Sequence, residues 1–390
     1  MPLPVTATTA ATFAPPVMQA RRWLAETTLP PDLPLLNLSQ AAPVDPPPGP
    51  LRAAMAQAVA EDPGLHLYAP VLGIPALRAA LARQTAALYR GAVSADQVAI
   101  TAGCNQAFCA ALAALAGRGD EVIIPVPWYF NHAMWLSLQG ITPRPLPCGP
   151  GLLPDPEDAA RLITPATRAI VLVSPNNPGG VEYPPALIDT FADLAARHGL
   201  ALILDETYRD FHTSDGPPHG LFARPGWDEV LVHLYSFSKA YRLTGHRVGA
   251  IIAARPLLAE IEKFLDTVAI CAPGPGQMGA LWGLENLGDW LAGERQEILR
   301  RRAAAIAGIA RLPGWDLQGC GAYFAWLRHP FQTPSPQLAR DMLARRAVLM
   351  LPGTMFRPSG DAAGNQELRL AFANADCAQL DDLIIRLADL

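Results

Sequence analysis

The sequence predicts an α/β protein in which helices cover both faces of a mainly parallel sheet and a smaller α+β domain follows. Between residues 46 and 285, short aliphatic runs alternate with longer segments of helical periodicity. Nearly continuous runs of this kind are typical of strands buried on both faces, and their alternation with helices favours parallel pairing. After about residue 285 the alternation stops, and a long helical pattern at 288–311 precedes the C-terminal region.

Six aliphatic runs are predicted to form strands of this sheet. They cover residues 97–103, 121–126, 168–174, 200–206, 229–236 and 248–254. The helices between them include 75–89, with a proline in its first turn, and 186–199, which ends at a glycine. The apolar segment 107–117 is shorter than the roughly 20 residues that span a bilayer, so we expect a buried helix there.

The length of the chain predicts its division into domains. A chain of 390 residues exceeds the usual size of one compact core, so we expect two closely associated domains. Residues 46–285 are expected to form the large domain, and residues 286–390 the small C-terminal domain. Residues 1–45 are expected to form an N-terminal arm and part of the small domain, and the sequence indicates no function for residues 1–30.

The composition excludes several classes of function. The net charge is −5 and both signs are scattered, so we expect neither a nucleic-acid partner nor a membrane partner. The six cysteines form no CxxC pair and no metal-ligand spacing, so no metal site is expected. The N-terminus lacks the positively charged start of a secretory signal. A cytoplasmic enzyme with reduced thiols is the interpretation that these features favour.

One lysine attracts attention because lysine is scarce. Of the 30 lysines and arginines, only Lys239 and Lys263 are lysines. A lysine can lose its proton and form a Schiff base with a carbonyl, whereas an arginine stays protonated. Lys263 lies in a helical pattern and is expected to be solvated, which leaves Lys239 as the candidate nucleophile.

Polar and aromatic residues gather where the predicted strands end, the edge at which open α/β sheets bind ligands. These segments are TAGCNQAF (101–108), IPVPWYFNH (124–132), VSPNNPGG (173–180), DETY (205–208) and SFSK (236–239). A helix that begins near Asn105 offers free N–H groups to a phosphate. Asp205 is placed to hold a pyridinium nitrogen, an aromatic residue to stack on a ring, and an asparagine to bind a phenolic oxygen. Pyridoxal phosphate requires this combination of groups.

With these motifs, the chain resembles the fold-type I pyridoxal-phosphate aminotransferases of class I/II over nearly its whole length. The segment SKAYRLTGHRVG (238–249) is similar to the signature around the Schiff-base lysine of that family. The resemblance implies a large domain with a mainly parallel seven-stranded sheet between helices, plus a smaller α+β domain. It also implies transfer of an amino group from an L-amino acid to a 2-oxo acid, through a Lys239 Schiff base and a pyridoxamine phosphate intermediate.

The resemblance implies a cofactor role for residues at each strand end. Lys239 would carry the cofactor, Asp205 would hold its pyridinium nitrogen, and Tyr129 would stack on its ring. Two residues, Asn177 and Tyr208, would reach the phenolic oxygen. The remaining contacts, which are to the phosphate, would come from Gly103, Cys104, Asn105, Ser236, Ser238 and Arg247.

The resemblance also implies substrate and subunit contacts. Arg369, together with Asn177, would bind the α-carboxylate of the substrate through a bidentate fork. Ala41, in NLSQAAP (37–43), would lie near the substrate where the family usually has glycine. Tyr68 would complete the active site of a neighbouring subunit, which implies a catalytic role in a homodimer. His132 matches a histidine that supports the aspartate in some members, and a buried core histidine is the alternative.

Several questions stay open at the level of sequence. The same apparatus supports β-elimination in relatives, so a C–S lyase on the same fold is the alternative enzyme. A ligand sensor of a transcription regulator would need an N-terminal DNA-binding domain, and residues 1–45 show no such pattern. Asn105 stands where some aspartate-specific members have lysine. This favours neutral or aromatic amino donors, without excluding a dicarboxylate bound by another arginine.

Overall fold

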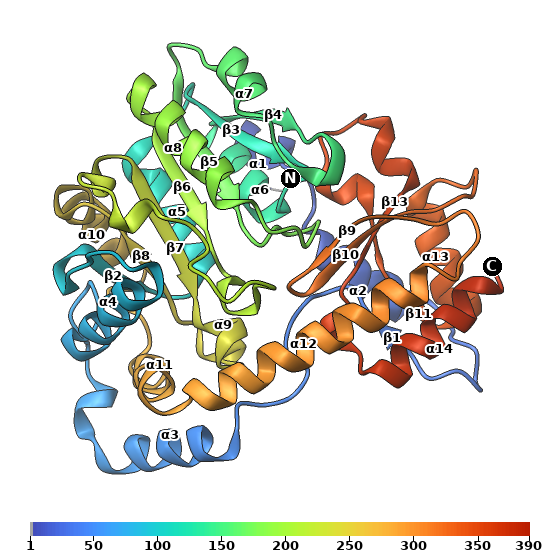
Figure 1. Ribbon diagram of the computed structural model, residues 1–390, viewed down its shortest axis with the longest axis horizontal. Helices are drawn as coiled ribbons and strands as arrows, with labels where there is room; N and C mark the ends of the chain where they lie inside the picture. The colour runs from blue at the N-terminus through green and yellow to red at the C-terminus, as the bar shows by residue number, and fades with distance from the viewer. Residues whose placement is uncertain (1–2) are drawn as a thin grey trace.

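The computed structural model describes residues 3–390, so the first two residues of the expected arm lie outside it. These residues form a large sheet with helices on both faces and a separate, smaller sheet region (Figure 1). Helix α12 (Gly288–Ile309) begins beside the large sheet and extends along the smaller one.

The large sheet has seven strands in the order β2-β8-β7-β6-β5-β3-β4. Their bounds are β2 Val98–Thr101, β3 Glu121–Val126, β4 Thr142–Pro147, β5 Thr167–Val173, β6 Ala201–Asp205, β7 Leu231–Ser236 and β8 Gly249–Ile252. Of the seven strands, only β8 runs in the direction opposite to the others, which confirms the mainly parallel seven-stranded sheet. The six predicted strands are all present. The sequence did not indicate β4 because its residues TPRPLP are rich in proline, which edge strands tolerate.

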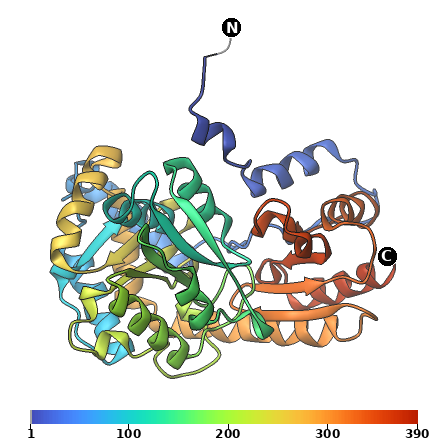
Figure 2. The same ribbon diagram turned by 90° about the horizontal axis from the view of Figure 1, so that it is seen from above.

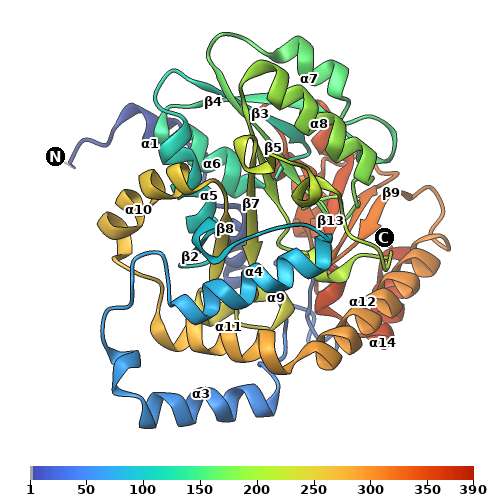
Figure 3. The same cartoon turned by 60° about the vertical axis from the view of Figure 1, so that its left-hand side comes forward.

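Alternation along the strands divides the interior of the large sheet into two layers. Leu202 and Leu204 of β6 face one layer and Ile203 faces the other, because successive side chains of a strand point to opposite faces. Helices that line the first layer are α3 Gly49–Glu61, α4 Pro75–Tyr89, α7 Pro156–Leu162, α8 Pro185–His198 and α11 Gly274–Asn286. Figure 3 shows α3, α11 and α4 side by side. Helices of the second layer are α5 Cys104–Leu115, α6 Phe130–Gln139 and α10 Arg255–Ala269.

The smaller sheet is antiparallel, in the order β12-β13-β10-β9. Its strands are β9 Asp316–Gly321, β10 Phe324–Arg328, β12 Leu351–Pro352 and β13 Glu367–Leu370, with helices α13 Ser335–Arg346 and α14 Cys377–Ala388. The N-terminal part of the chain joins this region, because β1 (Leu36–Asn37) pairs in parallel with β11 (Val348–Leu349). Helix α2 (Pro16–Glu26) buries Ala20 and Trp23 in the same core.

The N-terminal segment crosses between the two regions. Helix α1 (Ala7–Ala11) contacts α6 beside the large sheet, whereas α2 packs on the smaller one. Figure 2 shows the N-terminus projecting from the molecule before α2 turns toward the small region. Residues 3–26 therefore touch both walls of the space between the two sheets. Within residues 3–390, no helix combines the length and the apolar character needed to cross a membrane.

Glycines allow the two regions to meet backbone to backbone. Gly180, with a φ of +74°, lies so close to Gly321 of β9 that a Cβ on either residue would overlap the other's backbone. A Cβ at Gly179 would lie 2.6 Å from Cδ1 of Leu152. The Leu152 methyl therefore occupies the space that any larger side chain at residue 179 would need.

A buried cluster anchors the end of β6 on the face opposite Asp205. The carboxylate of Glu206 is fully buried and accepts hydrogen bonds from the Tyr89 hydroxyl, from His219 Nε2 (3.2 Å) and from His233 Nε2 (2.8 Å). Burial by itself would raise the pKa of Glu206, but the two histidines hold it well below its ordinary value. Three elements distant in sequence are thus tied to the residue that follows Asp205.

Replacing Glu206 by glutamine is expected to lower the free energy of unfolding by about 3 kcal/mol, because one partner of a buried charged cluster is removed. Urea denaturation at pH 7 measures this. The control is Glu260→Gln, which breaks an exposed ion pair with Lys263 and should change stability by less than about 0.5 kcal/mol.

The same pair of variants has an expected pH dependence. The charge of Glu206 stabilises the fold above pH 4.5, the ordinary pKa, and this stabilisation is lost as the pH falls toward the lowered pKa of the folded state. The difference between wild type and Glu206→Gln should therefore shrink on acidification. A difference that stays constant from pH 7 to pH 3 would contradict this role of the charge.

Candidate active site

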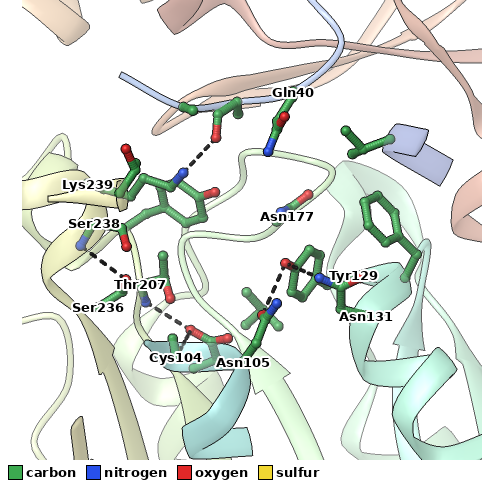
Figure 4. A pocket seen from close by; sticks show the side chains of 18 of the residues that line it. Gln40, Cys104, Asn105, Tyr129, Asn131, Asn177, Thr207, Ser236, Ser238 and Lys239 are labelled. Carbon is green, nitrogen blue, oxygen red and sulfur yellow. Dashed lines mark hydrogen bonds between the residues drawn. The ribbon is translucent and has the colours of Figure 1, made fainter. Parts of the chain in front are cut away.

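A cavity of about 530 Å³ lies at the carboxyl ends of the large-sheet strands, between the two regions. It collects residues from nearly every segment that the sequence singled out (Figure 4). The predicted site residues that line it are Ala41, Cys104, Asn105, Tyr129, Asn177, Asp205, Tyr208, Ser236, Ser238, Lys239, Arg247 and Arg369. Gly103 borders the cavity through its contact with Arg247, whereas Tyr68 lies elsewhere.

Lys239 projects into this cavity from helix α9 (Phe237–Ala240), which directly follows β7. Its Nζ donates a hydrogen bond of 2.6 Å to the carbonyl oxygen of Ala41. Burial of the amine, together with the nearby charges of Arg369 and Arg247, lowers the pKa of Lys239 to about 7. The amine is therefore close to its neutral, nucleophilic form at neutral pH, a state that an arginine cannot reach.

Asp205 ends β6 and presents a buried carboxylate to the cavity. Its Oδ2 lies 3.3 Å from Nε2 of His132, and its Oδ1 accepts a 3.0 Å hydrogen bond from the N–H of Thr207. Burial would raise the pKa of Asp205, but these partners lower it below its ordinary value. Asp205 therefore stays charged and can pair with a cation such as a protonated ring nitrogen.

His132 is placed by stacking as well as by its contact with Asp205. Its ring lies parallel to that of Phe108, with the centroids 3.7 Å apart. The sequence left two alternatives for His132, a buried core residue and a support for the aspartate. The geometry combines both. The histidine is buried in the layer behind the site and touches the Asp205 carboxylate.

The start of helix α5 forms an anion cradle with Arg247. Gly103, at the N-cap of α5 with a φ of +86°, leaves room for the Arg247 guanidinium, which a Cβ at residue 103 would overlap. A Cβ at Gly249 would lie 2.6 Å from the backbone nitrogen of Cys104, so glycine is needed there as well. Free N–H groups at a helix start beside a guanidinium bind phosphate. The hydroxyls of Ser236 and Ser238 line the same cavity.

Arg369 of β13 enters the cavity from the small region. Its guanidinium lies between the rings of Phe324 and Phe356, at 4.9 and 4.7 Å from their centroids. One terminal nitrogen donates to Oδ1 of Asn177 at 2.9 Å, and the other donates to the carbonyl of Ser39. No acidic group pairs with it among the described residues, and its buried Nε has no partner in that part of the chain. This is a cation held ready for a carboxylate.

Tyr129 forms the side wall, with its ring in the cavity. Its hydroxyl accepts a 2.8 Å hydrogen bond from Asn131 and lies 3.3 Å from Oδ1 of Asn105. Tyr208 is buried nearby, opposite Lys239 Nζ at 5.9 Å from its ring centroid.

Several lining residues were not singled out from the sequence. They are Val17, Arg21, Gln40, Ala42, Phe130, Asn131, Val173, Thr207 and Thr244. All of them except Val17 and Arg21 lie within the segments quoted from the sequence, so their position was available as a signal. Arg21 lies on α2 in the N-terminal segment, for which no pattern in the sequence indicated a role.

The residues present fit pyridoxal phosphate. Gly103 and Gly249 let the Arg247 guanidinium and the backbone at the start of α5 come close together, so a cation and free N–H groups lie side by side for a phosphate. The buried carboxylate of Asp205 matches a pyridinium nitrogen, and the amine of Lys239 has the pKa that attack on an aldehyde requires. When bound, this cofactor supplies a conjugated ring that accepts electrons from the substrate.

Comparisons with known proteins agree with this fit. Residues 34–387 match the family described as aminotransferase class I and II. The chain is 33% identical over 307 residues to an arginine–pyruvate transaminase of Pseudomonas aeruginosa, covering 78% of this chain and 77% of that protein. It is 33% identical over 266 residues to a methionine aminotransferase of Escherichia coli, covering 68% and 67%.

Solved structures show the same fold. A methionine aminotransferase of Escherichia coli superposes with a TM-score of 0.90, at 26% identity and full coverage of both chains. Aspartate aminotransferase of Thermus thermophilus with maleate gives 0.89, at 25% identity and 99% coverage of both. From the family match, the relatives and the cofactor-shaped cavity together, the chain belongs to the aminotransferase class I and II family, whose pyridoxal-phosphate enzymes transfer amino groups.

Proposed function

We propose that this enzyme moves the amino group of an L-amino acid to a 2-oxo acid with the site residues in the following roles. The observation that carries the proposal is the placement of a lysine with a pKa of about 7 in one cavity with Asp205 and Arg369. Asp205 holds the proton on the ring nitrogen. Arg247, Ser236, Ser238 and the start of α5 hold the phosphate.

Arg369 orients the substrate. Its guanidinium, fixed between two aromatic rings, binds the α-carboxylate, while Asn177 holds one of its terminal nitrogens in place. A fixed carboxylate limits rotation of the substrate, so the Cα–H bond is held in one direction. Tyr129 stacks on the ring of the cofactor, and Tyr208 borders that ring. The backbone carbonyl of Ala41 holds Nζ of Lys239 beside the substrate.

Proton transfer belongs to Lys239. With its lowered pKa the amine takes the proton from Cα as a general base near neutral pH. Burial, together with the nearby charges of Arg369 and Arg247, lowers the pKa enough for the neutral amine to be available near pH 7. The small region carries Arg369 and the large region carries Lys239, so the two must stay together for these steps.

The products distinguish this reaction from the alternative, a C–S lyase. The purified holoenzyme is incubated with single L-amino acids and with 2-oxo acids, and all products are identified. A new amino acid together with the oxo acid of the donor supports transfer. Pyruvate and ammonia from a cysteine-type substrate, with no new amino acid, would identify the lyase.

Replacing Lys239 by arginine is expected to lower kcat by about 100- to 10,000-fold, because a guanidinium keeps its proton and cannot act as the base. Steady-state assays with the best donor measure this. Lys263→Arg, at the exposed second lysine, is the matched control and should leave kcat unchanged. Borohydride reduction followed by mass spectrometry should find the cofactor on the peptide that contains Lys239. Cofactor on the Lys263 peptide instead would disprove the assignment.

We further propose a homodimer in which Tyr68 serves the active site of the partner. Tyr68 is 79% exposed and does not line the cavity of its own chain. Its neighbour Leu67 is 71% exposed, and Val268 and Ile270, at and just after the end of α10, are exposed as well. Large apolar side chains exposed in this way are typical of protein interfaces. We also propose residues 46–285 and 286–390 as the two domains and, since all six cysteines are free, a cytoplasmic location.

Mixing two impaired variants tests the shared site. Lys239→Ala and Tyr68→Ala are each expected to lose most activity, and refolding or co-expressing them together should restore about a quarter of the wild-type sites. This follows because half of the dimers are mixed and one of the two sites in each is intact. Activity that stays at the level of the separate variants, in a sample shown to be dimeric, would place Tyr68 outside the partner's site.

A further inference from the structure

One positively charged side chain that lines the cavity, that of Arg21, has no role in the reaction proposed above. Arg21 lines the cavity from α2, and its Nη2 donates a hydrogen bond of 3.2 Å to Oε1 of Gln40, another lining residue. Both side chains are exposed. Arg247 and Arg369 account for the phosphate and the α-carboxylate, so Arg21 is left without an anion.

The protein itself does not neutralise Arg21. Asp205 is the one carboxylate among the described lining residues, and it is already engaged by His132 and by the N–H of Thr207. Across residues 3–390, no ion pair involves Arg21. A guanidinium at the wall of a partly enclosed cavity raises the local concentration of anions, and a carboxylate matches its fork of donors.

The surroundings of Arg21 fit a carboxylate at the far end of a substrate. The lining of the cavity includes the amides of Gln40, Asn105 and Asn131, which can donate further hydrogen bonds. Figure 4 shows Gln40 on the opposite side of the cavity from Asn105 and Asn131. A carboxylate that reaches Arg21 therefore finds further hydrogen-bond donors in the same cavity.

We propose that Arg21 is a specificity-determining residue that binds the distal carboxylate of a dicarboxylic amino acid or 2-oxo acid. The proposal rests on the transfer reaction proposed above and names its substrate class. It differs from the expectation of neutral or aromatic donors that Asn105 favours, because the cation comes from the N-terminal helix rather than from residue 105.

The test compares substrates that differ mainly in the distal charge. Holoenzyme is assayed with L-glutamate, L-glutamine and L-methionine, and kcat and KM are measured for each with one common 2-oxo acid. Arg21→Ala is expected to lower kcat/KM for L-glutamate by about 10- to 100-fold, as for loss of a charge-assisted pair, mostly through KM. The values for L-glutamine and L-methionine should change by less than about two-fold. Arg21→Lys should restore part of the loss.

The neighbouring arginine is the matched control. Arg22 is exposed on the same helix and does not line the cavity, so Arg22→Ala should leave all three substrates unchanged. A binding readout is independent of turnover. Succinate should bind the holoenzyme more tightly than butyrate by isothermal titration calorimetry, and Arg21→Ala should remove most of that difference.

The outcomes separate this proposal from the proposed function. Transfer from L-glutamine or L-methionine with no preference for L-glutamate overturns the role of Arg21 and leaves the transfer reaction intact. An equal loss for all three substrates in Arg21→Ala also overturns it, because the arm would then act without regard to charge. Absence of transfer from every amino acid would instead overturn the proposed function.

Discussion

The buried carboxylate of Asp205 is the constraint around which the active site is built. A charge taken out of water must be paired or it is lost to protonation. Here the pairing comes from His132 on α6 and from the backbone just after β6, and the stacking of His132 on Phe108 fixes α6 against α5. The position of one charge thus sets where two helices meet the sheet. On the other face Glu206 repeats the arrangement with its own histidines.

The cations of the cavity act together. Arg369 and Arg247 hold anions in the proposed roles, and burial together with these same positive charges lowers the pKa of Lys239. Their repulsion of a protonated amine is therefore part of what makes the lysine reactive. An enzyme of this kind does not need a separate base to activate its nucleophile. The groups that recognise the cofactor phosphate and the substrate also prepare the amine.

Much of this site was predictable from sequence because strand ends of a parallel sheet meet at one edge. Aliphatic runs identified six strands, and the polar residues after them, from Asn177 to Lys239, came together as expected. Strand β4 was not predicted because its prolines interrupt the aliphatic pattern of a strand. They are tolerated because an edge strand does not need a hydrogen-bond donor at every residue.

Arg21 and the Glu206 cluster were missed for a different reason. Glu206 meets Tyr89 and His233 from other elements, and Arg21 reaches the cavity only because the N-terminal segment folds across it, so no spacing in the sequence could indicate either contact. Tyr68 was named from the sequence, but it lies outside the cavity of its own chain, so its role stays a prediction.

The contact between Gly180 and Gly321 has a consequence for how this enzyme can diversify. Where two main-chain segments touch without side chains, their separation does not depend on the side chains that line the cavity. Mutations at Arg21, Asn105 or Asn131 can then change the chemistry of the cavity while its dimensions stay the same. Laboratory evolution toward a new amino donor should accumulate changes at residues that line the cavity and leave Gly180 and Gly321 unchanged. The contact between Gly180 and Gly321 keeps the spacing of the two regions constant while the residues that select the substrate change.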